Sequence, residues 1–213
     1  MISSKEYFYN NFDNFGFIIT EFTEQELAPI KKEIEEYKHK GLDKSWVTID
    51  DELLLEKSKQ HIENLIMPFA LEYDNLYNYL ETKYGLLDKK LPVTLDTVWV
   101  NFQKKHEFSP AHNHNGLFSF VIWIDIPYNI KDEQSHSAAR FPATLNKDLN
   151  LPGHFQFIFP TTLGETTTHT IPVDQTYNNK MIIFPSRIYH AVYPFYTSDN
   201  YRITVSGNFK FKT

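Results

Sequence analysis

The chain has 213 residues, and its 21 Lys and Arg residues against 27 Asp and Glu residues give a formal net charge of −6. This length predicts a single domain, and the acidic balance argues against nucleic acid or an anionic membrane as the main partner, because phosphate binding needs clustered cations. The absence of cysteine excludes disulfides, thiolate nucleophiles and iron–sulfur clusters.

Neither a targeting segment nor a membrane span is expected. The first ten residues contain Lys5 and Glu6 and have no apolar core, which a signal peptide requires. The longest apolar stretch, 117–126, is far shorter than the roughly 20 residues that cross a bilayer. We therefore expect a soluble, cytoplasmic protein.

Residues 1–90 have mainly helical patterns, after a possible opening strand at 14–20. Thr23 and Glu26 have the spacing of a capping box at the start of a helix. Pro29 instead favours a helix that begins at this proline as its first residue. The sequence leaves both starts open, and Gly41 is a natural end for either helix.

A second helix is expected after a possible strand at 45–49, with Asp50 or Asp51 as its cap. Its apolar face would consist of Leu55, Ile62, Leu65 and Ile66. Pro68 should end this helix or start a third one, which ends near Gly85. We interpret residues 1–90 as helical support within a single domain, 1–213.

Residues 91–213 have the pattern of a β core. Short runs rich in aromatic and β-branched residues, several followed by proline, predict strands at 92–102, 117–126, 154–159, 166–173, 180–184, 187–193 and 200–211. Such a series of short strands is typical of a sandwich or barrel. The polar stretch 129–152 is predicted to be an irregular loop that could cover the entrance to a site.

Two of the nine histidines stand out by their spacing. His112 and His114 lie in the segment PAHNHNG, directly before a predicted strand. In an extended segment both rings point to one face, with Cα atoms about 6.6 Å apart, and can bind one metal ion. His190, on or beside another predicted strand, is the best candidate for a third ligand. The alternative is a chance spacing in which each ring forms only local hydrogen bonds.

The last predicted strand has one polar face, formed by Arg202, Thr204, Ser206 and Asn208, and one apolar face. The polar face either meets water at a sheet edge or lines the interior of a barrel that holds a polar ligand. A guanidinium inside a barrel requires an anion, and a carboxylate is its natural bidentate partner.

The order of these features along the chain, first His112 and His114, then His190 and then Arg202, resembles the motif order of the Fe(II)/2-oxoglutarate-dependent dioxygenases. The resemblance is to the oxygenase branch whose first motif is His-x-His. The resemblance covers about residues 92–210, through Trp99 and Asn101, His112 and His114, 184–186, His190, and Arg202 and Thr204. It implies an α+β chain that is mainly β, in which a double-stranded β-helix (jelly-roll, cupin-like) core packs against the N-terminal helices.

The resemblance also implies a site. His112, His114 and His190 would hold Fe(II), and Arg202, with Thr204 as helper, would bind the distal carboxylate of 2-oxoglutarate. Asn101 would help to bind the cosubstrate or hold a metal ligand in place, or else it only forms a cross-strand hydrogen bond.

One ligand departs from the common set of two histidines and one carboxylate. His114 stands where most of the superfamily has Asp or Glu, which leaves the metal more positive. We favour His114 itself as the ligand. Alternatively, Asp125 or Glu107 supplies a carboxylate, or His114 is the first ligand and Gly116 occupies the carboxylate position, leaving room for a halide.

The implied activity is oxidative decarboxylation of 2-oxoglutarate coupled to hydroxylation of a small molecule or a protein side chain. Two other functions stay open. One is a non-catalytic, cupin-like protein that binds a metal or ligand, and the other is a three-histidine dioxygenase that does not use 2-oxoglutarate. Arg202 distinguishes the 2-oxoglutarate enzyme from these two functions, because only that enzyme needs the charge of Arg202 in its cavity.

Overall fold

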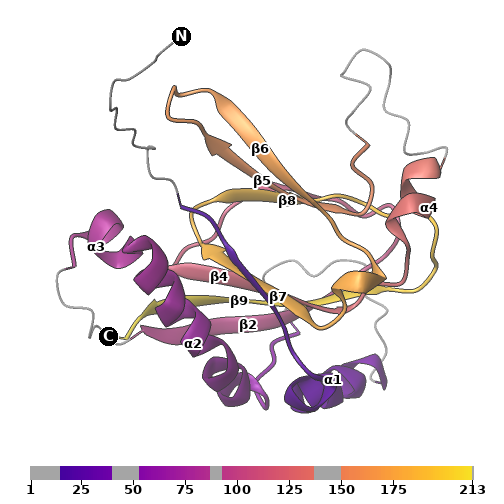
Figure 1. The fold of residues 1–213 in the computed structure, drawn as a ribbon. Coiled ribbons are helices and arrows are strands. Elements are labelled where there is room, and N and C mark those ends of the chain that lie inside the picture. The colour runs from indigo at the N-terminus through magenta and orange to yellow at the C-terminus, as the bar shows by residue number, and fades with distance from the viewer. Residues whose placement is uncertain (1–14, 40–52, 87–92, 137–149, 213) are drawn as a thin grey trace, which may run out of the picture.

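The computed structural model describes residues 15–39, 53–86, 93–136 and 150–212, which form two antiparallel sheets and several helices (Figure 1). The five-stranded sheet has the order β1 (Ile18–Glu21), β7 (Lys180–Pro185), β4 (Phe118–Asp125), β9 (Arg202–Phe211), β2 (Val93–Gln103). The four-stranded sheet has the order β3 (Ser109–His112), β8 (Tyr189–Val192), β5 (His154–Pro160), β6 (Thr166–Pro172). The expected mainly β class is therefore confirmed.

The two sheets pack face to face, and aromatic side chains fill the space between them. Phe155 and Phe157 project from the four-stranded sheet, and Trp123 and Phe184 project from the five-stranded sheet into the same cluster. Phe157 meets Phe184 edge-on, with ring centroids 4.9 Å apart. Aromatic pairs of this kind add to the free energy of burying the rings.

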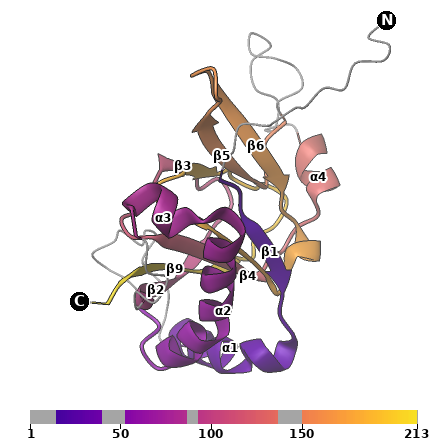
Figure 2. The ribbon, with the colours of Figure 1, turned by 60° about the vertical axis from the view of Figure 1, so that its left-hand side comes forward.

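The outer face of the five-stranded sheet is covered by α1 (Glu24–His39) and α2 (Lys59–Tyr77), as Figure 2 shows. The side chains between helices and sheet form a second apolar cluster, which includes Ile30, Ile62, Ile66, Val100, Ile122 and Val205. Each strand of this sheet therefore has one face toward the helices and one toward the other sheet, as alternating side chains require.

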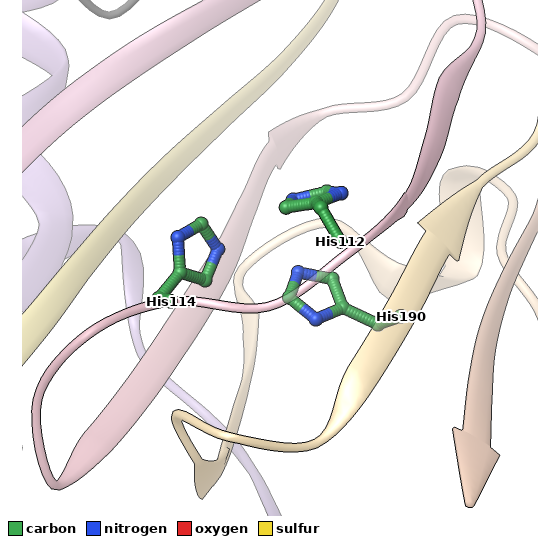
Figure 3. Close-up of side chains that lie close together, drawn as sticks. All are labelled: His112, His114 and His190. Atoms are coloured by element: carbon green, nitrogen blue, oxygen red, sulfur yellow. The ribbon is translucent and has the colours of Figure 1, made fainter.

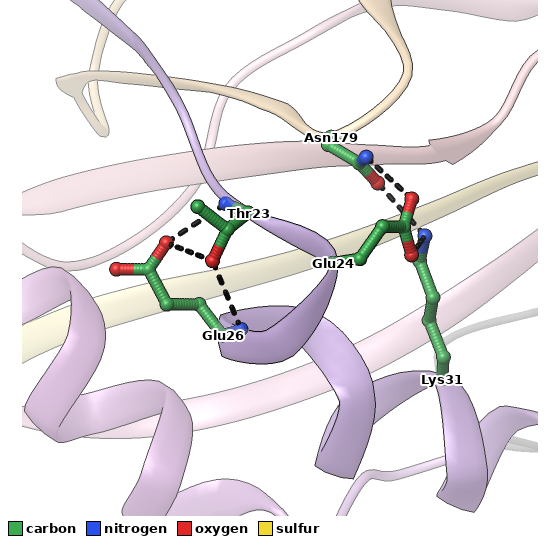
Figure 4. Close-up of polar contacts among 5 residues, drawn as sticks. All are labelled: Thr23, Glu24, Glu26, Lys31 and Asn179. Carbon is green, nitrogen blue, oxygen red and sulfur yellow. Dashed lines mark hydrogen bonds and ion pairs between the residues drawn. The ribbon is translucent and has the colours of Figure 1, made fainter.

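Helix α1 begins at the capping box and not at Pro29. Thr23 Oγ1 accepts a hydrogen bond from the N–H of Glu26 (3.3 Å), and the Glu26 carboxylate accepts one from the N–H of Thr23 (2.8 Å; Figure 4). Pro29 therefore lies inside the helix. The start at Pro29 is wrong because the two reciprocal bonds satisfy N–H groups that are otherwise free at a helix start.

A polar cluster joins the first turn of α1 to the turn before β7 (Figure 4). The Glu24 carboxylate accepts hydrogen bonds from Asn179 Nδ2 (2.7 Å) and Lys31 Nζ (2.6 Å), and Lys31 also reaches Asn179 Oδ1 (2.8 Å). The cluster fixes α1 relative to β7, which lies between β1 and β4 in the sheet.

Pro68 neither ends α2 nor starts a new helix, contrary to expectation. The helix runs on to Tyr77, and its buried face continues on both sides of the proline, through Ile62, Ile66, Ala70 and Tyr73. Packing of this face against the sheet outweighs the hydrogen bond that proline removes. The expected caps Asp50 and Asp51 and the expected strand 45–49 lie outside the described residues.

The remaining elements are short. Helix α3 (Tyr79–Tyr84) ends at Gly85, as expected, and Gly85 has the positive φ of 69° that favours glycine. Helix α4 (Ile130–Ser135) lies in the stretch expected to be irregular, and residues 137–149 of that stretch lie outside the described residues. A 3-10 turn, η3 (Gln175–Tyr177), precedes β7. Within the described parts of the chain, no helix combines the length and apolarity that crossing a membrane demands.

We expect Thr23→Ala to lower the free energy of unfolding by about 1 kcal/mol, the usual effect of removing an N-cap side chain. Thr162→Ala, at an exposed position in the turn between β5 and β6, is the control. Urea denaturation of both variants checks this. Equal stability of the two would show that the capping box does not determine where α1 starts.

Candidate metal centre

The pairing of β3 with β8 places two histidines side by side. His112, the last residue of β3, is the direct partner of His190 in β8. His114 follows two residues later, where its N–H donates to the carbonyl oxygen of Ser186 (2.8 Å). Figure 3 shows the three rings around one common space. One ligand nitrogen of each ring lies within 4.8 Å of the other two.

The surroundings keep two of the rings, those of His114 and His190, neutral. His190 is 3% exposed and stacks on Phe155, with ring centroids 5.4 Å apart. Burial, and next the neighbouring His112, lower the pKa of His190 to about 3. The same two causes, burial first, lower the pKa of His114 to about 4. At neutral pH these two rings therefore carry the free lone pair that a metal needs.

Backbone carbonyls orient two of the rings. His112 Nδ1 lies 2.7 Å from the carbonyl oxygen of Pro110, and His190 Nδ1 lies 3.2 Å from that of Ile188. A carbonyl oxygen only accepts, so Nδ1 is the protonated nitrogen in both rings. The lone pair is then on Nε2, the arrangement usual for metal-binding histidines. The three residues fit a transition metal that accepts imidazole ligands, such as iron.

Among the residues that the structure describes, no carboxylate joins this cluster. Asp125 is exposed and lines a groove with Lys31 of α1, on the helical side of the sheet. The Glu107 carboxylate instead accepts a hydrogen bond from the N–H of Lys104 (2.8 Å). At Gly116, with φ of 115°, a Cβ would lie 2.7 Å from the carbonyl oxygen of Phe209, so a larger side chain there would clash with the backbone.

Arg202 is buried between the sheets at the start of β9, with 2% exposure. Its Nε donates to Gln103 Oε1 (3.0 Å), its Nη1 to the Tyr128 hydroxyl oxygen (2.7 Å) and its Nη2 to the carbonyl oxygen of Tyr193 (2.9 Å). The guanidinium also lies against the rings of Tyr128 and Phe195, whose centroids are 5.9 and 5.5 Å from its central carbon. All these partners are uncharged.

Thr204 and Asn101 are direct partners across β9 and β2. Asn101 Nδ2 donates to Thr204 Oγ1 (3.4 Å) and Ser206 Oγ (3.3 Å). The cross-strand hydrogen bond considered for Asn101 is therefore present. All three side chains lie on the same face of the sheet as Arg202, as the alternation in the sequence predicts.

The structure adds residues that the sequence analysis did not select. Gln103 could have been found, because it lies two residues beyond Asn101 and so shares its face of β2. Trp99, whose ring centroid is 5.8 Å from that of His114, was selected only as part of the motif. Tyr128 and Phe195 lie in loops, where no periodic pattern shows which way a side chain points.

Comparison with known proteins gives a match to one family over about half of the chain. A family model described as "Putative 2OG-Fe(II) oxygenase" matches residues 97–208, a range that includes the six candidate site residues, His112, His114, His190, Arg202, Thr204 and Asn101. The chain belongs to this family. The expected resemblance to the 2-oxoglutarate-dependent oxygenases is thereby confirmed.

Solved structures with a similar fold match most of the chain. The 2-oxoglutarate-dependent epimerase SnoN from nogalamycin biosynthesis is 11% identical, with a TM-score of 0.53 over 93% of this chain and 79% of that one. A second SnoN structure, in complex with Fe3+, alpha-ketoglutarate and nogalamycin RO, gives 0.50 at 11% identity, over 92% and 79%. AviO1 from Streptomyces viridochromogenes is 10% identical, with a TM-score of 0.52 over 92% and 89%. No curated protein matches this chain.

We expect His190→Ala to lose stoichiometric Fe(II) binding, because it removes the most buried nitrogen of the cluster. His169→Ala, at an exposed position on β6, should bind Fe(II) as the unchanged protein does. Anaerobic metal titration followed by metal analysis of the desalted protein checks both. Full iron retention by His190→Ala would remove His190 from the ligand set.

Proposed function

We propose that this oxygenase uses Fe(II) and 2-oxoglutarate to hydroxylate a small molecule or a protein side chain. His112, His114 and His190 hold the iron, and Arg202, Thr204 and Asn101 bind the cosubstrate. The two sheets form a double-stranded β-helix within a single domain, 1–213. The apolar cluster that unites helices and sheet supports this division of the chain.

The observation that carries the proposal is a buried guanidinium without a carboxylate partner. Among the described residues, Arg202 has no ion pair. A buried charge that only neutral groups surround is costly, and a ligand carboxylate would offset that cost. Arg202 Nη2 donates to the carbonyl oxygen of Tyr193, which directly follows β8, the strand that carries His190, and this bond links the cation to that strand.

The donor count leaves room for such a ligand. A guanidinium has five N–H groups. Gln103 accepts from two of them, one on Nε and one on Nη2. The Tyr193 carbonyl accepts the second N–H of Nη2, and the Tyr128 hydroxyl accepts one N–H of Nη1. One N–H of Nη1 therefore remains. The Tyr128 hydroxyl accepts from Arg202 and can donate its own proton, for which the Gly153 carbonyl oxygen at 3.3 Å is a distant partner. The remaining N–H of Arg202, together with the Tyr128 hydroxyl once it exchanges its long bond to Gly153, suits one carboxylate.

The chain's contribution to the reaction is binding and exclusion of water. Iron, when bound, supplies the redox chemistry that couples decarboxylation of 2-oxoglutarate to oxidation of the substrate. Phe155 and Phe184 form dry walls beside His190. Three neutral ligands leave the metal with its full positive charge, which favours an anionic cosubstrate more than a ligand set with a carboxylate does.

Two rival functions make different predictions. A three-histidine dioxygenase without 2-oxoglutarate has no use for a buried, unpaired Arg202. A non-catalytic binding protein needs no iron in a redox-active state. Adding Fe(II) and 2-oxoglutarate without oxygen separates all three, because the chelate of iron with this cosubstrate absorbs visible light. Bound iron without this band favours the first rival, and absence of bound iron favours the second.

We expect Arg202→Ala to bind Fe(II) normally but to bind 2-oxoglutarate about ten- to a hundredfold more weakly, the usual effect of losing hydrogen bonds from a charged donor. Arg187→Ala, which removes an exposed guanidinium from the turn between β7 and β8, should keep the original affinity. Anaerobic titration of 2-oxoglutarate into each iron-loaded variant measures this. Equal affinities would refute the assignment of Arg202.

A further inference from the structure

Gln103 occupies the position in which a buried arginine normally has a carboxylate as its partner. It is the direct cross-strand partner of Arg202, and its Oε1 accepts hydrogen bonds from both Nε and Nη2 of the guanidinium. This is the edge of a guanidinium that a carboxylate binds with two parallel hydrogen bonds. Here a neutral amide oxygen takes that edge.

The amide is held in the orientation that presents its oxygen. Gln103 Nε2 donates to the carbonyl oxygen of Glu107 (2.6 Å), which can only accept, so Oε1 must face Arg202. The Glu107 carbonyl is itself fixed in a tight turn, in which the Glu107 carboxylate accepts from the N–H of Lys104 and the Glu107 N–H donates to the Lys104 carbonyl oxygen (3.3 Å). The turn between β2 and β3 thus sets the position of the guanidinium.

The two buried carboxylates near Tyr128, those of Glu133 and Asp174, form hydrogen bonds to groups other than Arg202, and Asp174 accepts from the N–H groups of Ile130 and Thr176. Glu133 of α4 is fully buried, and its two oxygens accept hydrogen bonds from the N–H groups of Tyr196 and Thr197 (2.7 and 2.9 Å). These bonds fix the loop that places Phe195 against the guanidinium. The fold therefore fixes Arg202 on several sides and gives it no negative partner among the described residues.

We propose that Gln103 is the positioning residue of the anion site, orienting Arg202 while leaving its charge available to a ligand carboxylate. This inference rests on the proposed function of Arg202. Its physical basis is that an acid of the same shape at position 103 would pair with the guanidinium and remove its attraction for an anion. The neutrality of Gln103, and not only its hydrogen bonds, is then required.

The test is Gln103→Glu, which keeps the shape and the acceptor and changes only the charge. In the absence of 2-oxoglutarate, its melting temperature should equal or exceed that of the unchanged protein, and Fe(II) should bind normally. Its affinity for 2-oxoglutarate should fall about ten- to a hundredfold, since the ligand now competes with an internal carboxylate. Gln103→Ala keeps the charge of Arg202 available and should lose only about three- to tenfold.

Gln134→Glu is the matched control, because it makes the same substitution at an exposed position of α4. It should bind 2-oxoglutarate as the unchanged protein does. Anaerobic titration of 2-oxoglutarate into the iron-loaded proteins, with melting curves alongside, gives all the readouts. A stable Gln103→Glu variant with unchanged affinity would overturn the inference.

Failure of the proposed function and failure of the Gln103→Glu variant to fold can be told apart. If the unchanged, iron-loaded protein binds no 2-oxoglutarate, the proposed function fails before any variant is compared. If Gln103→Glu does not fold, Gln103→Met decides, because it is neutral and similar in size but has no strong acceptor. Retained iron with a three- to tenfold weaker affinity for 2-oxoglutarate would support positioning by Gln103, and unchanged affinity would contradict it.

Discussion

The register between β3 and β8 is the constraint on which the candidate centre depends. It places His112 opposite His190, and a slip of one residue would turn one of the two rings to the other face of the sheet. The third ring is fixed by backbone bonds. The N–H of His114 binds the carbonyl oxygen of Ser186, and the N–H of Ser186 binds that of Leu117. Strand pairing therefore sets the cluster before any metal takes part.

Burial affects the histidines and Arg202 in opposite ways: it makes His114 and His190 neutral but leaves Arg202 charged. The imidazoles can respond to a dry environment by losing their proton, and His114 and His190 have lowered pKa values for that reason. A guanidinium cannot lose its proton under the same conditions, so Arg202 stays a cation among neutral acceptors. Neutral nitrogens suit a metal ion, and an unpaired cation suits a carboxylate. Burial thus leaves two imidazoles neutral and a guanidinium charged within the same fold.

Strand β9 connects the site to the helices. Arg202 and Thr204 face the inner side of its sheet, while Ile203 and Val205 belong to the apolar cluster beneath α1 and α2. Close packing continues at Gly207, where a Cβ would lie 2.6 Å from the ring of Phe120. The helices therefore stabilise the strand that carries Arg202 and Thr204.

Local patterns in the sequence were sufficient for most of the β core. All seven predicted strands are present with ends shifted by no more than a few residues, because alternation and proline boundaries are local signals. The motif that contains His112 and His114, with His190 as the expected third residue, likewise led to three side chains that the structure brings together. A helix start with two competing signals, Thr23 and Pro29, could not be resolved from sequence, and Pro68 was misjudged because the packing of α2 lies outside the local pattern.

The partners of Arg202 were decided only by the tertiary structure. The sequence determined that a guanidinium shares a face with Thr204 and Ser206, and that its charge would require an anion if it were buried. It did not show that Gln103, Tyr128 and Tyr193 would surround it, because these residues come from different elements and two of them lie beyond the ends of strands. Periodicity describes neighbours along one strand, whereas contacts between distant segments depend on how the two sheets and their loops pack together.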